Sequence, residues 1–397
     1  MPSVEAFGME LRRRRLHSGL SLRALARIVH FDPSHLSRVE NGERHAGAEL
    51  ARLCDAALGA GGALEMLADD SGLLGGAEPE YQHPFGTAQF DAAAQYRIDG
   101  EVRWEALRAL FRRMREAGRQ IAPAMVIPAI AAQARTVSSL AAVAGPADRH
   151  EALRLAAHHA EYIGWMLQEQ GDVAGALEWT ARAVELDARG GGLDMAAYAL
   201  VRRAELALYQ ARPDRALALV AQARETGGAS RRIHAMAAQR EAQAFALAGD
   251  RAGCEAALAR SEECWASGTG RQDRLDLFGS SSIGDPNAMA AAWCELDLGR
   301  PDDAAEQTVA VLATVPDASH RIRALLSARL AVALALAGAL QSSCDLAEQV
   351  IPDSRSLQSA TTMHQLARLS GVLGRWPRNR RAQQVRADLH WLLHPRR

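Results

Sequence analysis

Apolar residues recur at every third or fourth position along most of the chain, the spacing that places them on one face of a helix. Residues 4–67 show this pattern in short segments separated by tight turns, and residues from about 98 to 397 show it in long ones. Residues 68–97 between them are rich in Gly, Pro and polar side chains, as linkers are. The pattern predicts an all-α protein with a domain at 1–67, a linker at 68–97 and a second domain at 98–397.

The segment 19–44, GLSLRALARIVHFDPSHLSRVENGER, predicts two short helices joined by a turn. Ser21 is placed to cap the first helix, because its hydroxyl can accept from a backbone N–H that the helix leaves unpaired. Leu22, Leu25, Ala26 and Val29 then follow at i, i+3, i+4 and i+7 and give that helix one apolar face. Ala26 is small at the point where the two helices must cross closely.

The second helix carries equally clear start and stop signals. Asp32 can cap it, and Pro33 fits its first turn, where no backbone N–H is needed. Leu36 and Val39 are expected to point inward, and Asn41-Gly42 ends the helix, since glycine readily takes a positive φ. Cap, apolar spacing and stop therefore agree over 26 residues.

Residues 5–67 resemble the helix-turn-helix domain of phage Cro and repressor proteins, also called the xenobiotic-response-element family, a five-helix domain. The ending LSRVENGER and the opening GLSLRALA carry most of the resemblance. One departure is His30, which stands in the turn where the family normally has glycine. The resemblance implies a sequence-specific transcriptional regulator that binds double-stranded DNA.

In that family the second helix lies in the major groove, which makes its outward residues the candidate DNA contacts. Arg38 is the expected base reader, because a guanidinium can donate two hydrogen bonds to guanine O6 and N7. Two alternatives concern ion pairs within the domain: Arg38 could pair with Glu40 or Glu10, and Glu40 is expected to pair with an arginine of the first helix. The candidate DNA-binding residues are Arg38, Ser34, Ser37, Pro33, His35, Arg23 and Arg44. The last three are expected to contact phosphates, together with one or more of Arg12–Arg15.

The C-terminal region repeats a helix, a turn and a second helix. Copies are visible at 162–187, 203–225, 240–263, 291–316 and 329–353, and residues 98–145 are expected to add another helix pair. A small residue follows each turn, with spacings of 40, 38, 50 and 39 residues: Ala176, Ala216, Cys254, Ala304 and Ser343. Such a period predicts an α-solenoid, in which each helix pair buries its apolar face only by stacking on its neighbours.

The repeats resemble tetratricopeptide repeats, with small residues such as Gly164, Ala176 and Ala183 where two helices approach closely. Their period is nearer 40 than the standard 34, and an insertion at about 266–284 is expected to form a loop. The whole layout resembles peptide-sensing regulators of Gram-positive bacteria and many actinobacterial regulators. It implies a homodimer whose DNA binding responds to a peptide or small-molecule effector.

The inward positions of the repeats are the candidate effector contacts, since helices of this kind line a concave face. They form a mixed aromatic and polar set: Trp165, Glu161, His158, Tyr198, Glu205, Tyr209, Gln239, Gln243, Trp293 and Arg368. An alternative is a scaffold that binds a partner protein and no small ligand. A closed, polar-lined pocket would favour a ligand, and an open, shallow groove would favour a protein.

Composition narrows the classes of function. All 46 basic residues are arginine and the net charge is −1, so a generally basic nucleic-acid binder is excluded, although residues 1–53 hold nine Arg against six acids, or 9 − 6 = +3. The start has no signal-peptide pattern, no apolar run approaches a membrane span, and the five cysteines form no CxxC pair, so a cytoplasmic protein is expected. No catalytic or metal-binding motif is present, which predicts no enzyme activity, no metal and no cofactor.

Overall fold

The computed structural model describes residues 2–29, 31–42, 46, 48–58, 60, 64, 97–98, 101–266 and 283–394. The chain divides into two compact units, residues 1–89 and 90–397. The division falls within residues 65–96, which the structure does not describe. Most of the linker expected from the sequence lies in this range. We treat the two units separately as the N-terminal domain and the repeat domain.

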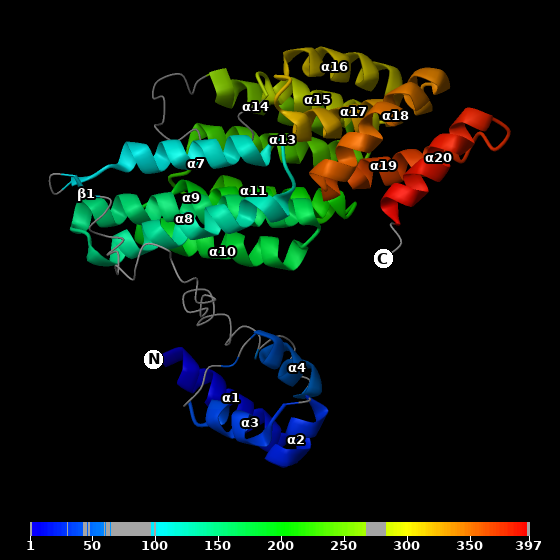
Figure 1. The fold of residues 1–397 in the computed structure, drawn as a ribbon. Helices are drawn as coiled ribbons and strands as arrows, with labels where there is room; N and C mark the ends of the chain where they lie inside the picture. Colours follow the sequence, from blue (N-terminus) through cyan, green and yellow to red (C-terminus); the bar gives the residue numbers. More distant parts are fainter. Residues whose placement is uncertain are drawn as a thin grey trace. The chain divides into compact units, whose positions relative to one another are not determined.

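Four helices of the N-terminal domain are described: α1 (Pro2–His17), α2 (Leu22–Ile28), α3 (Pro33–Glu40) and α4 (Ala48–Leu58) (Figure 1). They enclose one apolar core, to which α1 contributes Phe7 and Leu11, α2 contributes Leu25, and α3 contributes Leu36. The expected fifth helix lies outside the described residues. The core residues of α2 and α3 are those that the apolar spacing selected.

The local signals at the ends of α2 and α3 are confirmed. Ser21 Oγ accepts from the backbone N–H of Ala24 at 3.1 Å, and Asp32 Oδ1 accepts from the N–H groups of Ser34 and His35 at 2.8 and 3.2 Å. Gly42 follows α3 with φ of 71°, a conformation that a side chain would strain. These caps satisfy N–H groups that have no partner inside the helix, so each helix begins where the sequence placed it.

The repeat domain begins with a two-stranded antiparallel hairpin, β1 (Arg97–Ile98) paired with β2 (Glu101–Val102), and is otherwise helical over its described residues. The all-α class is thereby confirmed. The helices are α7 (Trp104–Gly118), α8 (Pro123–Val143), α9 (Pro146–Gln170), α10 (Val173–Arg189), α11 (Asp194–Tyr209), α12 (Pro213–Glu225), α13 (Arg231–Leu247), α14 (Arg251–Ala266), α15 (Pro286–Asp297), α16 (Pro301–Thr314), α17 (His320–Leu336), α18 (Leu340–Leu357), α19 (Ala360–Leu373) and α20 (Arg380–Leu393).

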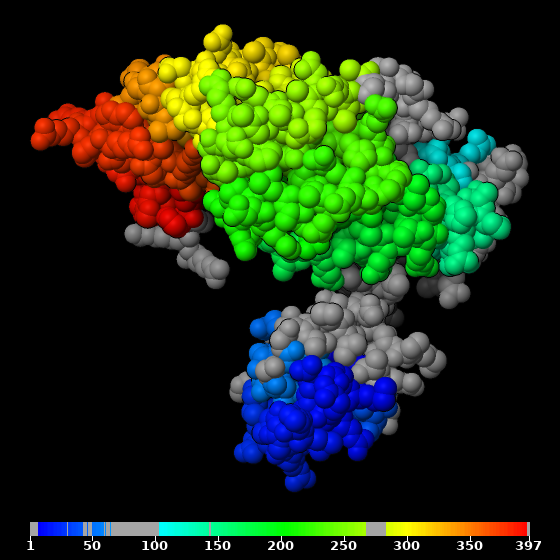
Figure 2. All heavy atoms as spheres, turned by 180° about the vertical axis from the view of Figure 1, so that it is seen from behind, coloured from blue at the N-terminus to red at the C-terminus, as the bar shows by residue number. Residues whose placement is uncertain are grey.

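Helices that follow one another in the chain pack against each other in pairs. The pair α7 and α8 is the extra pair expected before the first copy. Seen from behind, the pairs follow one another in sequence order from green through yellow to red (Figure 2). The small residues that follow each turn are all buried: Ala176, Ala216, Cys254, Ala304 and Ser343. Gly164 shows why size matters, because a Cβ there would lie 3.1 Å from the carbonyl oxygen of Ala176 in the partner helix.

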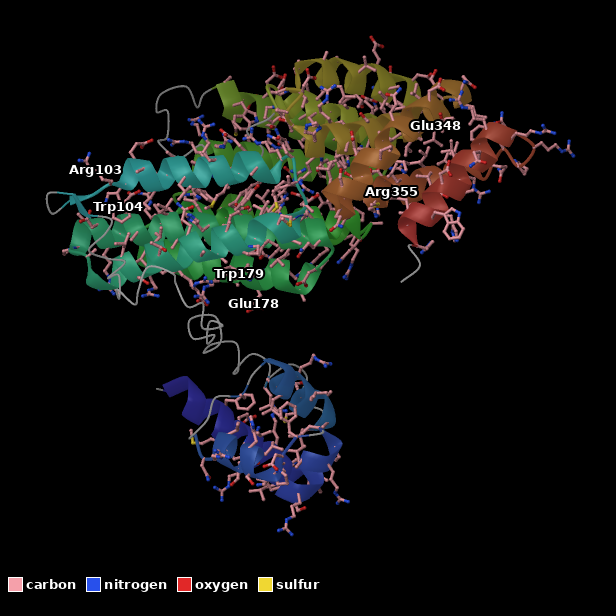
Figure 3. All side chains as sticks on the ribbon, viewed as in Figure 1. Arg103, Trp104, Glu178, Trp179, Glu348 and Arg355 are labelled. Atoms are coloured by element: carbon pink, nitrogen blue, oxygen red, sulfur yellow. The ribbon has the colours of Figure 1, made fainter. Side chains whose placement is uncertain are left out.

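Polar contacts join the ends of the repeat domain to their neighbours, and Figure 3 labels one residue of each contact, Trp104 and Glu348. The indole N–H of Trp104, at the start of α7, donates to Asp148 on α9 at 2.8 Å. Near the other end, Arg381 on α20 donates to both carboxylate oxygens of Glu348 on α18 at 3.2 and 3.0 Å. End repeats have a neighbour on one side only, and these links add to the packing that they retain.

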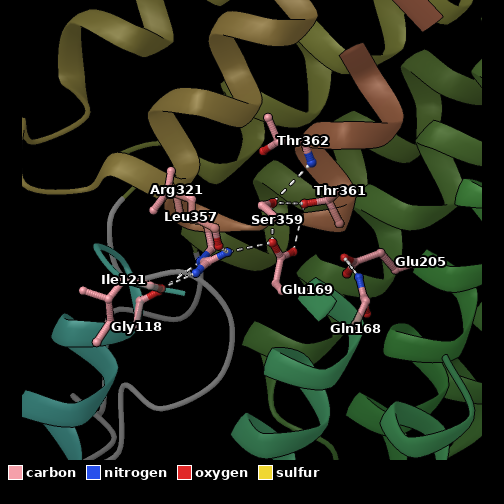
Figure 4. A network of polar contacts seen from close by, with 10 residues as sticks. All are labelled: Gly118, Ile121, Gln168, Glu169, Glu205, Arg321, Leu357, Ser359, Thr361 and Thr362. Carbon is pink, nitrogen blue, oxygen red and sulfur yellow. Dashed lines mark hydrogen bonds and ion pairs between the residues drawn. The ribbon is translucent and has the colours of Figure 1, made fainter. Parts of the chain in front are cut away.

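The first helices of the repeat domain also meet α17 around Arg321, the second residue of that helix (Figure 4). Its guanidinium donates to the carbonyl oxygens of Gly118 and Ile121 at 3.0 and 2.6 Å and to Glu169 at 3.2 Å. Glu169 in turn accepts from Ser359 and Thr361 at the start of α19, at 2.5 and 2.8 Å. This buried network, which we call the closure network, joins the start of the repeat domain to α17 and α19, about 200 residues further along the chain.

One described helix departs from the sequence expectation of no membrane span. Residues 123–142 of α8 are long and apolar enough to cross a membrane when judged by length and composition alone. In the structure, Val126, Ile130 and Leu140 of this helix lie buried in the core that α7, α8 and α9 share. We therefore interpret α8 as a packed helix of the repeat domain.

Candidate DNA-reading helix and inner cavity

The outward side of α3 borders a shallow hollow between α2 and α3. Ser34 and Arg38 are exposed there, and Pro33 and Ser37 are half-buried. Arg23 on α2 faces the same hollow from the other side. The structure thus brings together five of the seven candidate DNA contacts on one accessible face.

The other two candidates stand apart from this hollow. His35 is half-buried, and its ring meets that of Phe31 edge-on with centroids 5.6 Å apart. It therefore packs against the turn between α2 and α3. Arg44 lies outside the described residues, as does His30 in the turn. The contact of either with DNA stays a prediction.

Both acids that the sequence offered as partners for Arg38 are engaged elsewhere. Glu40 accepts two hydrogen bonds from the buried guanidinium of Arg15 on α1, at 2.6 and 2.7 Å, which confirms its expected pairing with the first helix. Glu10 accepts from Arg13 and Arg14, and these hydrogen bonds lower its pKa to about 2. Arg38 makes a long contact of 3.4 Å to the carbonyl oxygen of Ser34 one turn earlier. Neither Glu10 nor Glu40 therefore pairs with the guanidinium of Arg38, which lies on the exposed face of α3.

The repeat domain contains an inner cavity of about 410 Å³, lined by α7, α9, α11, α13, α15, α17 and α19 with Trp265 of α14. This volume lies within the range of small-molecule binding sites. Many of its polar wall residues are nine-tenths or more buried although they face the cavity, so the site is recessed among the helices and is not a shallow groove. Nine of the ten candidate effector residues line it: Glu161, Trp165, Tyr198, Glu205, Tyr209, Gln239, Gln243, Trp293 and Arg368.

His158, the tenth, does not line the cavity. It lies one turn before Glu161 in a part of α9 that α7 covers, where the neighbouring His159 stacks on Phe111 with centroids 4.0 Å apart. Burial, with Arg115 and His159 nearby, lowers the pKa of His158 to about 3. The repeat pattern extended the inner face one turn too far, because it does not show where α7 seals it.

The cavity wall carries more charge than the sequence reading assigned to it. Arg202 donates to Glu205 at 2.9 Å and to Gln168 at 2.5 Å, and lies 4.0 Å from Glu161. Burial raises the pKa of Glu161. Burial acts on Glu205 in the same direction, but the positive charges of Arg202 and Arg240 outweigh it and its pKa is lowered.

The arginines of the wall are the residues that sequence reasoning missed. They are Arg115, Arg119, Arg202, Arg232, Arg240, Arg321 and Arg329, in addition to the expected Arg368. A signal was present, since Arg202 and Arg240 lie three residues before Glu205 and one after Gln239 on the same inner faces. Arginine is usually exposed, so a pattern that equates inward positions with apolar or neutral residues passes over it.

Aromatic groups occupy another part of the wall. The ring of Tyr209 meets those of Trp293 and His364 edge-on, at 6.3 and 5.7 Å, and the guanidinium of Arg329 lies 3.6 Å from the centroid of Trp293. Edge-on rings and a cation over an indole are favourable arrangements in a site sheltered from water. The cavity therefore offers apolar surfaces beside charged ones, which suits an amphipathic ligand.

Comparison with known families identifies the N-terminal domain. Residues 6–67 match the family described as a helix-turn-helix domain. The chain carries a DNA-binding helix-turn-helix domain. Comparison with curated proteins and with solved structures gave no match. The likeness of the repeats to tetratricopeptide repeats thus rests on their sequence pattern and helix-pair architecture.

The helix-turn-helix match and the all-helical fold fit a regulator without enzymatic activity. Within the described part of the chain, no group of three or more His, Cys, Asp or Glu side chains is arranged to hold a metal ion. The five cysteines are free thiols, four of them buried and Cys264 half-buried. What remains to be explained is the partner of the exposed face of α3 and the occupant of the inner cavity.

Proposed function

We propose that this protein is a sequence-specific transcriptional regulator whose helix α3 reads bases in the major groove of DNA. The observation that carries the proposal is the exposed face of α3, on which Ser34 and Arg38 project beside Arg23 of α2 within a matched helix-turn-helix domain. Arg38 supplies the bidentate donor that distinguishes guanine. Arg23 supplies a phosphate contact that positions the domain.

Genome-wide footprinting with purified full-length protein tests this assignment. We expect Arg38→Ala to lose preference at one guanine per half-site, a cost of about 1–3 kcal/mol. Arg13→Ala is the matched control, because Arg13 is an exposed arginine of the same domain that pairs with Glu10 on α1, and even as one of the candidate phosphate contacts it should leave base preference unchanged. Unchanged site preference in Arg38→Ala would assign base reading to another residue.

We also propose that the inner cavity binds a small-molecule or short peptide effector. A recessed cavity of about 410 Å³ with charged and amide side chains in its wall favours a ligand sensor over a partner-protein scaffold with an open groove. All seven tryptophans of the chain lie beyond residue 97, and Trp165, Trp265 and Trp293 line the cavity. Tryptophan emission therefore reports on the repeat domain.

Titration with the neutral fluorescent probe N-phenyl-1-naphthylamine tests the cavity. A cavity open to apolar ligands predicts saturable binding of one probe per chain, with energy transfer from tryptophan to the probe. Absence of saturable binding would favour the scaffold alternative.

A homodimer is the third part of the proposal and follows from the expected architecture of such regulators. Two helix-turn-helix domains related by a two-fold axis read half-sites about 34–36 Å apart, one turn of DNA. Footprints should therefore be palindromic with centres about 10 base pairs apart. Asymmetric single half-sites, together with a monomer in sedimentation, would contradict the dimer.

A further inference from the structure

The inner face of α13 forms a continuous stripe along the cavity. Met236, Gln239, Arg240, Gln243 and Leu247 all line it. Their spacings of three and four residues place neighbouring side chains on one side of a helix, with Cβ atoms about 5–6 Å apart. Gln243 thus lies one turn after both Gln239 and Arg240 on the same face of α13.

Three hydrogen-bond donors in this stripe have no partner among the described residues. They are Nε2 of Gln239, Nε of Arg240 and Nε2 of Gln243, and all three atoms are buried. Gln239 and Gln243 are only 4% and 3% exposed. The orientation of the Gln243 amide follows from its contacts, because its Oε1 accepts from Arg240 at 2.6 Å and leaves the N–H groups unpaired.

Such an arrangement is costly unless something accepts these hydrogen bonds. A buried donor without a partner loses its hydrogen bonds to water and gains none in return, and three such donors lie together here. The carboxylate of Glu205 lies 3.5 Å from a terminal nitrogen of Arg240. Glu205 already accepts from Arg202 and Gln168, so it leaves the three donors unsatisfied.

The charge of the described wall favours an anion as the missing acceptor. Eight arginines and four carboxylates line the cavity, an excess of 8 − 4 = 4 positive charges. Burial and the charges of Arg368 and Arg329 lower the pKa of His364. Burial also lowers the pKa of Arg329 to about 10, with Arg368 adding to the effect against the opposing pull of Asp297. A bound anion would offset this positive charge.

We infer that Gln239, Arg240 and Gln243 form a subsite for the oxyanion of an organic acid, whose apolar body lies against the aromatic part of the cavity wall. Trp293 and Tyr209 supply that aromatic surface, and Trp265 adds a further unpartnered donor, its Nε1. The inference rests on the proposed effector cavity and names the class of ligand that it takes. A free organic acid and the terminal carboxylate of a short peptide share the chemistry of this subsite.

Two probes of similar shape separate this inference from the cavity function itself. 8-Anilinonaphthalene-1-sulfonate has an aromatic body and an anionic group, and N-phenyl-1-naphthylamine has the same body without the charge. We expect the full-length protein to bind the anionic probe about tenfold more tightly or better, as charge-assisted hydrogen bonds allow. Short peptides with free and amidated C-termini, compared in the same way, distinguish a peptide carboxylate from a free acid.

The variant Gln239→Met/Gln243→Met removes both amide donors while keeping side-chain length and helix propensity. We expect it to lose about tenfold or more in affinity for the anionic probe and to keep its affinity for the neutral one. Gln365→Met is the matched control, since Gln365 lines the cavity from α19 and its unpartnered atom is the acceptor Oε1. It should leave the anionic preference intact.

The outcomes separate cleanly. Equal affinity of wild type for the two probes, or an equal loss of both in the double variant, would overturn the oxyanion subsite and leave the cavity function standing. Failure of wild type to bind either probe would contradict the cavity function and the subsite with it.

Discussion

The two domains place their polar functional residues under opposite conditions. In the N-terminal domain the buried ion pair Arg15–Glu40 holds α1 to α3, and the candidate DNA contacts Ser34 and Arg38 are exposed. In the repeat domain the candidate effector contacts are buried or half-buried, and nine of the ten, including Glu205 and Gln239, face the inner cavity. A surface that meets a large polyanion needs exposed donors, whereas a small ligand needs an enclosed wall that holds unsatisfied ones.

The largest effect should come from the closure network of the repeat domain. Arg321→Met removes a buried guanidinium that binds Glu169 and the carbonyl oxygens of Gly118 and Ile121, and leaves Glu169 short of its counter-charge. We expect a loss of about 3–5 kcal/mol in the free energy of unfolding of the repeat domain. Urea unfolding followed by tryptophan emission measures it.

Arg323→Met is the control for this substitution. Arg323 lies two residues after Arg321 on α17, is more exposed, and donates to the carbonyl oxygen of Val315 at 2.9 Å outside the closure network. We expect a loss of about 1 kcal/mol, that of an ordinary hydrogen bond. Equal losses in the two variants would show that closure contributes little to stability.

The next largest effect should be a loss of stability of the repeat domain in mild acid. Burial lowers the pKa of His158 to about 3 and that of His159 to about 4, so the unfolded chain binds protons near pH 6.5 that the folded chain refuses. The stability of the repeat domain is therefore full above pH 6.5 and falls as the pH drops toward these folded-state values. Each histidine should cost about 2 kcal/mol at pH 5.

Urea midpoints from tryptophan emission at pH 7 and pH 5 measure this loss. In the variant His158→Gln/His159→Gln the difference between the two midpoints should shrink. An unchanged difference would place the acid sensitivity in other groups.

The smallest expected effect is a gain in stability at the turn between α11 and α12. Ala211 has φ of 54°, whereas the equivalent turns carry Gly171, Gly249, Gly299 and Gly338 with φ between 79° and 86°. Ala211→Gly should relieve strain and stabilise the repeat domain by about 0.5–1 kcal/mol, after the entropy cost of glycine. A lower urea midpoint in this variant would contradict the strain argument.

The same comparison explains what the sequence could predict. Caps and stops act within three or four residues, so Ser21, Asp32 and Gly42 could be assigned from the sequence alone, and so could the pairing of Glu40 with the first helix. The repeat period likewise identified the inner helix faces. The closure network could not be predicted, because it joins Arg321 to Gly118 across 203 positions and no periodicity links them. The buried arginines of the wall were missed for another reason, because arginine is usually exposed and a pattern that expects apolar or neutral residues at inward positions passes over it.

The central claim is that Arg38 reads a base, and a double-mutant cycle on the strongest footprinted site tests it most directly. Affinities of wild type and Arg38→Ala are compared on that site and on the site with the contacted G·C pair replaced. The account predicts that wild type discriminates between the two sites by about 1–3 kcal/mol and that Arg38→Ala does not. If Arg38→Ala weakened binding to both sites equally and kept the discrimination, Arg38 would be a phosphate contact and the claim would be wrong.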